Sequence, residues 1–157
     1  MKAAPCLIAL ASLLALAACN DDATESGAGG SGSGGSSSGE PHQLCVDQIN
    51  DLRATVSLAD YQRWASAEDC SDQQAADDAA AGTPNSTTGA CGELTSTTCF
   101  GVQGPASSML PSCLNMMWGG GPGDANYDML ASDTYTQVAC GFHTETDGSM
   151  WLMLNFQ

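Results

Sequence analysis

Residues 134–156, TYTQVACGFHTETDGSMWLMLNF, decide the fold of this chain. Val138, Cys140 and Phe142 alternate with other residues at a period of two, which is typical of a strand, and Asp147-Gly148 is a turn signal between two strands. In the second strand, residues 150–156, both alternating sets of side chains are mainly apolar. A strand that is apolar on both faces is buried on both faces. The sequence therefore predicts a C-terminal β-hairpin in the middle of a sheet that helices cover.

Helical patterns precede this hairpin. Apolar residues at helical spacing predict a short helix over residues 44–52, and a second helix is predicted from a cap at Asp69 to a stop signal at Gly82. A third helix, which begins or bends at Pro111, is predicted from an apolar stripe that consists of Met109, Cys113, Met116 and Met117. One or two further helical turns are expected over residues 126–131.

The N-terminus has the parts of a secretory signal. Lys2 precedes an apolar run that is too short for a membrane span, and the run ends in small residues. The end of the run, Leu16-Ala17-Ala18-Cys19, resembles the cleavage box of bacterial lipoproteins, in which the cysteine becomes the lipid-bearing first residue. We therefore interpret residues 1–18 as a lipoprotein signal peptide and Cys19 as the lipidation site that anchors the protein to a membrane. An ordinary signal peptide with a chance cysteine is the alternative.

Residues 19–39 comprise this cysteine and a flexible linker. From Ser26 to Gly39 every residue except Ala28 is Gly or Ser, and such a segment cannot bury a core. The folded domain is expected to span residues 40–157. Together these features predict an extracytoplasmic, membrane-anchored lipoprotein of a bacterium.

The charge of the chain excludes one class of partner. Among 157 residues there are 3 Lys and Arg against 18 Asp and Glu, a formal net charge of −15. Nucleic-acid binding requires Lys and Arg to neutralise phosphates, so no nucleic-acid partner is expected.

Six cysteines in the predicted domain indicate three disulfides. An even number of cysteines in a small secreted domain is typical of a disulfide framework, whose connectivity the sequence leaves open. Cys91 and Cys99 are the preferred local pair because they are close in sequence. A zinc site is disfavoured because no Cys-x-x-Cys spacing occurs. The six residues are Cys45, Cys70, Cys91, Cys99, Cys113 and Cys140.

The order of short motifs along residues 45–156 resembles the CAP superfamily, which comprises the cysteine-rich secretory proteins, antigen 5 and pathogenesis-related 1 proteins. Each motif is short, but together they follow the family's order. They are the Asn-x-x-Arg pattern of Ile49–Arg53, Gln74-Ala75-Ala76, Trp118, Val138-Ala139-Cys140-Gly141 and Asn155-Phe156. The resemblance implies an α+β fold, namely a three-layer α-β-α sandwich of the CAP type, here stapled by disulfides and with the β-hairpin at its centre.

The resemblance also implies a cavity in which many members hold a divalent metal with two histidines and two glutamates. In this chain Asn85 and Asn126 stand at the histidine positions, and Tyr127 follows the second of them. Glu93 matches one glutamate, whereas the other falls among three glycines at residues 119–121. Amide oxygens are weak ligands compared with imidazole. We therefore expect Asn85 and Asn126 to face each other across a cleft with Glu93 nearby, with no metal and no other cofactor.

These expectations favour a binding or structural module over an enzyme. Its ligand would be an unidentified protein, lipid or glycan, and no catalytic residue is assigned. Two alternatives remain open: a metal-independent hydrolase that uses Glu93 in the cavity, and a calcium-dependent surface protein that uses the acidic charge.

Overall fold

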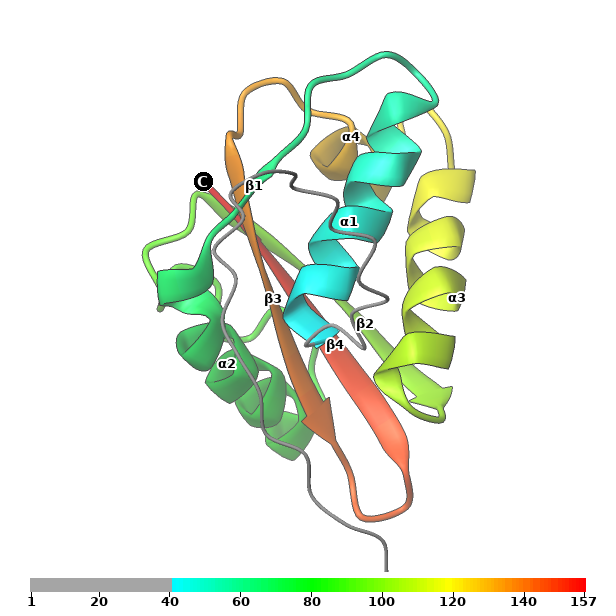
Figure 1. The fold of residues 1–157 in the computed structure, drawn as a ribbon. Helices are drawn as coiled ribbons and strands as arrows, with labels where there is room; N and C mark the ends of the chain where they lie inside the picture. The colour runs from blue at the N-terminus through cyan, green and yellow to red at the C-terminus, as the bar shows by residue number, and fades with distance from the viewer. Residues whose placement is uncertain (1–40) are drawn as a thin grey trace, which may run out of the picture. The chain divides into compact units, whose positions relative to one another are not determined.

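The computed structural model describes residues 41–157, which form an α+β unit with one mixed four-stranded sheet (Figure 1). The expected signal peptide, the expected lipidation site Cys19 and the expected linker lie outside the described residues. The helices are α1 (Pro41–Ala54), α2 (Glu68–Ala81), α3 (Ala106–Gly119) and α4 (Ala125–Leu130), and a single 3₁₀ turn, η1 (Ala65–Ala67), precedes α2. The strands are β1 (Gln62–Arg63), β2 (Thr95–Gln103), β3 (Gln137–Thr144) and β4 (Ser149–Phe156).

The predicted hairpin lies at the centre of the sheet. The strand order is β1-β3-β4-β2, so the hairpin strands β3 and β4 take the two inner positions. β4 is antiparallel to both of its neighbours, and β1 runs parallel to β3. After Ser149, every residue of β4 is buried. The prediction of a central C-terminal hairpin is confirmed.

The two faces of β4 pack against different helices (Figure 1). Leu152, Leu154 and Phe156 belong to the main apolar core together with side chains of α1 and α3. Trp151 and Met153 point to the opposite face and pack with Ala75 of α2. The two-residue period of a strand explains this division, because successive side chains point to opposite faces.

The close approach of α2 to the sheet depends on a glycine in β3. A Cβ atom at Gly141 would overlap the backbone of Ser71 and Asp72 in α2. The backbone of Phe142 also donates a hydrogen bond of 2.7 Å to the Asp72 carboxylate. The sheet therefore accepts α2 at this point because position 141 has no side chain.

The predicted helices are present, with corrections at their ends and faces. Gly82 ends α2 in the left-handed conformation with φ of 60°, as predicted, but the N-cap is Ala67, and Asp69 lies inside the first turn. The acidic first turn of α2 still complements the positive end of the helix dipole. α3 begins at Ala106, five residues before Pro111.

The predicted apolar stripe of α3 is partly wrong. Met116 is 65% exposed, whereas Leu110 and Leu114, which the stripe omitted, are buried together with the other three stripe residues. The buried face of α3 therefore includes two adjacent residues, Met109 and Leu110, and the residues four positions after each of them. Met116 lies outside this face.

Three disulfides join α1, α2 and α3 to the sheet or to a loop. Cys45–Cys140 connects α1 to β3, Cys70–Cys91 connects α2 to the loop before β2, and Cys99–Cys113 connects β2 to α3. The disulfide framework is confirmed, but the preferred local pair Cys91–Cys99 is wrong. Cys99 is buried in β2 toward α3, whereas Cys91 lies in the loop beside α2.

Candidate functional site

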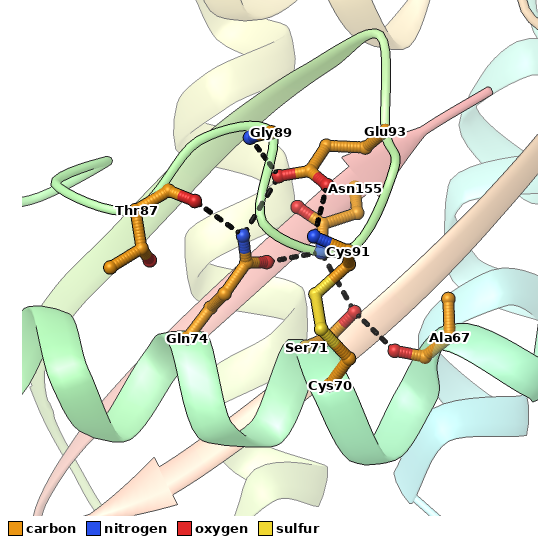
Figure 2. The surroundings of a disulfide bond; sticks show 9 residues. All are labelled: Ala67, Cys70, Ser71, Gln74, Thr87, Gly89, Cys91, Glu93 and Asn155. Carbon is orange, nitrogen blue, oxygen red and sulfur yellow. Dashed lines mark hydrogen bonds between the residues drawn. A yellow bond between two sulfur atoms is a disulfide. The ribbon is translucent and has the colours of Figure 1, made fainter.

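A buried polar network joins α2, β4 and the loop over residues 82–94, which connects α2 to β2 (Figure 2). Its members are Ser71 and Gln74 of α2, Asn155 of β4 and Glu93 of the loop. None of the four is more than 7% exposed. Glu93 is the one candidate cavity residue that the structure brings to this position, and the other three members were not assigned to the site from sequence.

Asn155 links the strand to the helix. Its Nδ2 donates hydrogen bonds to Ser71 Oγ at 2.8 Å and to Gln74 Oε1 at 2.5 Å. Ser71 Oγ in turn donates to the carbonyl of Ala67 at 2.9 Å. The amide of Asn155 thus orients Gln74 so that its own Nε2 faces the loop.

Gln74 and two backbone amides enclose the carboxylate of Glu93 (Figure 2). Gln74 Nε2 donates to Glu93 Oε1 at 2.8 Å and to the carbonyl of Thr87 at 2.8 Å. The N–H of Gly89 donates to Oε1 at 2.5 Å and the N–H of Cys91 to Oε2 at 2.9 Å. Both carboxylate oxygens are therefore engaged by groups of the protein itself.

These contacts decide the protonation state of Glu93. Burial by itself would raise the pKa of Glu93, but the hydrogen bonds from Gln74, Gly89 and Cys91 outweigh burial and hold the pKa below its ordinary value. An ionised carboxylate accepts hydrogen bonds and has no proton to donate. At neutral pH Glu93 is thus placed to hold the loop and not to act as a general acid.

The Cys70–Cys91 disulfide reinforces the same connection. Cys70 precedes Ser71 in α2, and the backbone of Cys91 donates to Glu93, so the covalent bond and the polar network tie the loop to one end of α2 (Figure 2). Two polar atoms beside the network, Asn155 Oδ1 and Thr87 Oγ1, are buried without a hydrogen-bond partner among the described residues.

Asp78 holds the other part of the loop. Its side chain is fully buried, and it accepts hydrogen bonds from the N–H of Asn85 at 2.6 Å and from the N–H and Oγ of Ser86 at 2.8 and 2.6 Å. Thr98 Oγ1 of β2 lies 3.0 Å from Asp78 Oδ2. Asp78 lies with Ser71 and Gln74 on the buried face of α2, and because that face is largely polar, no apolar pattern in the sequence marks Asp78 as buried.

The structure does not bring Asn85 and Asn126 together. Asn85 Oδ1 lies 3.0 Å from Thr98 Oγ1, whereas Asn126 Oδ1 accepts a hydrogen bond of 2.7 Å from Thr97. Thr97 and Thr98 are consecutive in β2, so their side chains point to opposite faces of the sheet. Their cross-strand partners, Leu154 and Met153, belong to the two different cores.

Tyr127 lies beside Asn126 in α4 and packs on Trp118 at the end of α3. The two ring centroids are 4.7 Å apart and the rings are tilted by 47°. Tyr127 therefore contributes to the packing of α3 on α4. Asn85 is exposed and has φ of 58°, a conformation that Asn adopts more readily than most residues.

The residues at the positions of the CAP metal site do not fit a metal ion. Asn85 and Asn126 are bonded on different faces of β2, and the oxygens of Glu93 are bonded inside the loop. Within residues 41–157, no three His, Cys, Asp or Glu side chains converge as possible metal ligands. We therefore derive no chemistry that passes through a metal at these positions.

The Asn-x-x-Arg pattern of α1 has a structural role. Asn50 exchanges two hydrogen bonds with the backbone of Tyr61, at 3.0 and 2.8 Å. Arg53 is only 2% exposed, and its guanidinium group lies 3.6 Å from the centre of the Tyr61 ring. It donates hydrogen bonds to the carbonyl oxygens of Ala59, Leu130 and Ser132 at 2.8, 2.7 and 2.8 Å. Burial raises the pKa of Tyr61 to about 12, although the charge of Arg53 opposes this shift. The pattern thus fixes the segments that follow α1 and α4.

Comparisons with known proteins add no relative. No protein-family model matches the chain, and no curated protein is significantly similar to it. In the described part, residues 41–157, no helix is both long enough and apolar enough to cross a bilayer.

Proposed function

We propose that this protein is a lipid-anchored, extracytoplasmic module of the CAP type that serves binding or structure and does not catalyse a reaction. In this proposal its helices and sheet correspond to the α-β-α sandwich of that superfamily, but without the family's cavity, because Asn85 and Asn126 are bonded on opposite faces of β2. The central hairpin and the structural use of the Asn-x-x-Arg pattern support this assignment.

One observation carries the choice of a module over an enzyme. The carboxylate of Glu93, which the hydrolase alternative requires, is bonded to Gln74, Gly89 and Cys91 and has a lowered pKa. A general acid needs a raised pKa, and a general base needs free access to the proton that it removes. The surroundings of Glu93 favour neither role.

Zinc calorimetry at moderate salt tests the absence of a metal centre. We expect only weak binding that falls with rising salt, because carboxylates on an acidic surface attract any divalent cation. The double variant N85H/N126H is the control. Since the two side chains bond on opposite faces of β2, it should bind zinc no better than the two single variants do. A stoichiometric, salt-resistant zinc site in the wild-type protein would contradict the proposal and restore the enzyme alternative.

Partitioning into detergent tests the anchor. We expect the variant C19S to leave the detergent phase, because each buried methylene of an acyl chain contributes about 0.8 kcal/mol to membrane binding. The variant C6S is the matched control and should partition like the wild-type protein, since Cys6 belongs to the expected signal peptide. If C19S also partitions like the wild-type protein, the lipoprotein assignment is wrong.

A further inference from the structure

A hollow of about 280 Å³ lies between the end of α1 and the middle of α3. On the α1 side it is lined by Gln48, Asp51 and Leu52, whose i, i+3 and i+4 spacing places them on one helix face, and by Thr55 in the turn after the helix. At about 30 Å³ for each water molecule, the hollow has the volume of roughly nine waters. It is therefore suited to a small molecule or a single long side chain.

The floor of the hollow is apolar. Leu114 and Pro111 of α3 face Leu52 of α1 across it, and Leu114 is only 1% exposed. Proline has a short, rigid side chain, so α3 does not fill the space opposite Leu52. An aliphatic chain would gain from burial against these three residues.

The polar atoms at the hollow favour a cation. Asp51 is exposed at its edge, and Gln48 Oε1 is a buried acceptor without a hydrogen-bond partner among the described residues. The Asp51 carboxylate can accept hydrogen bonds from a charged donor in the hollow, whereas Gln48 Oε1 is too deeply buried for a bound molecule to reach it. With a net charge of −15, the whole chain also attracts cations and repels anions.

Asp51 occupies an unfavourable place for a carboxylate. It lies in the last turn of α1, where the helix dipole is negative and favours a positive charge. Arg53, the basic residue of that turn, is directed to carbonyl oxygens of Ala59, Leu130 and Ser132, and Arg63 forms a bidentate pair with Glu68 at 2.6 and 2.7 Å. A bound cation would offset both the helix dipole and the charge of Asp51.

We propose that the hollow between α1 and α3 binds a primary ammonium group carried on a short aliphatic chain. The ammonium donates to Asp51, and the chain lies against Leu52, Pro111 and Leu114. The same chemistry is available from a free alkylamine or from a lysine side chain of another protein. This inference does not depend on the CAP-like assignment, because none of these residues belongs to the expected cavity.

Amide chemical shifts of the purified, isotope-labelled protein test the proposal with n-pentylammonium as the probe. We expect saturable shifts at the residues that line the hollow, and weaker binding at high salt. Pentanoate and pentanol have the same chain length and should not produce these shifts. Nα-acetyl-lysine amide distinguishes the two sources: binding at least as tight as that of pentylammonium indicates a lysine side chain, and clearly weaker binding indicates a free amine.

Two matched variants separate a site from a general effect of charge. D51N removes the carboxylate at the hollow and should weaken pentylammonium binding by about tenfold, as loss of a charge-assisted hydrogen bond predicts. D47N removes another exposed carboxylate one turn earlier in α1, outside the hollow, and should change binding by less than about twofold because exposed charges act weakly at a distance.

D51N should also unfold at the same temperature as the wild-type protein or at a higher one, since its carboxylate opposes the helix dipole. Equal losses in D51N and D47N would overturn the proposal in favour of a diffuse acidic surface. Equal binding of pentanol, or the absence of shifts at the hollow, would overturn it as well.

Discussion

Glu93 illustrates how one side chain can resemble a catalytic group and have a structural use. Its carboxylate accepts hydrogen bonds from one side chain of α2 and from two amides of its own loop. Hydrogen bonds to a charged group contribute more to stability than neutral ones do. The residue therefore contributes to stability for the same reason that it is unsuited to proton transfer.

Replacement of Glu93 by Gln should destabilise the fold by about 1.5–3 kcal/mol at neutral pH. The charge is lost, and the side-chain NH₂ group of the new glutamine would face an N–H donor that now bonds a Glu93 oxygen. Urea unfolding measures this change. The variant D77N is the control. It removes an exposed carboxylate of α2, which is bonded to the exposed side chain of Gln73, and should change stability by less than about 0.5 kcal/mol.

The pH dependence of this difference has a defined sign. The folded pKa of Glu93 lies below the ordinary value of 4.5. Its contribution to stability is therefore fully present above pH 4.5 and is lost as the pH falls through the lower folded pKa. The stability difference between wild type and E93Q should shrink over that range, and a difference that grows on acidification would contradict the assignment of an ionised Glu93.

At the scale of elements, the loop over residues 82–94 has neither helix nor strand and depends on its attachments. Asp78 holds its beginning, Glu93 holds its end, and Cys70–Cys91 joins it covalently to α2. The other two disulfides lie in the core between α1, α3 and the sheet. Loss of the loop disulfide should thus have a local effect that loss of the others does not have.

The double variant C70A/C91A should lose about 3 kcal/mol of stability, as expected for a disulfide that closes a loop of this length. Hydrogen exchange should accelerate mainly over residues 82–94, because the main core lies on the other face of the sheet. C45A/C140A is the comparison and should cost more, since it spans 95 residues and joins two core elements. Equal acceleration over the whole chain in C70A/C91A would contradict a local role.

At the scale of the whole molecule, the acidic charge is unevenly placed along the chain. No charged residue occurs over residues 94–123, which include β2 and α3, so the carboxylates are concentrated on the remaining segments. Excess charge of one sign destabilises a compact state by self-repulsion. Salt screens exposed charges over a distance of about 8 Å at physiological ionic strength.

Sodium chloride should therefore raise the unfolding temperature. A gain of roughly 1 kcal/mol corresponds to about 4 °C for a domain of this size. Calcium chloride at equal ionic strength is the control, and screening alone predicts a similar rise. A large rise at calcium concentrations too low to alter the ionic strength would instead support the calcium-dependent alternative.

Local patterns were sufficient for several elements. The alternation in residues 138–156 and the turn at Asp147-Gly148 predicted β3 and β4. Helical spacing predicted α1 and α3, and start and stop signals predicted α2. These patterns are reliable because the side chains that define them lie within a few residues of one another. β2 was missed: its threonine-rich sequence favours a strand, but its polar residues give no clear alternation.

The sequence by itself thus determined the central hairpin, the helices and the presence of a disulfide framework. Only the tertiary structure decided which cysteines pair, because Cys45 meets Cys140 through packing of segments 95 residues apart. It also decided that Asn85 and Asn126 lie on opposite faces of β2 and that Glu93 is bonded to Gln74 and not open to a ligand. The physical reason is that side-chain partners of a site come from distant segments, and their orientation depends on strand register and helix packing, which no local pattern records.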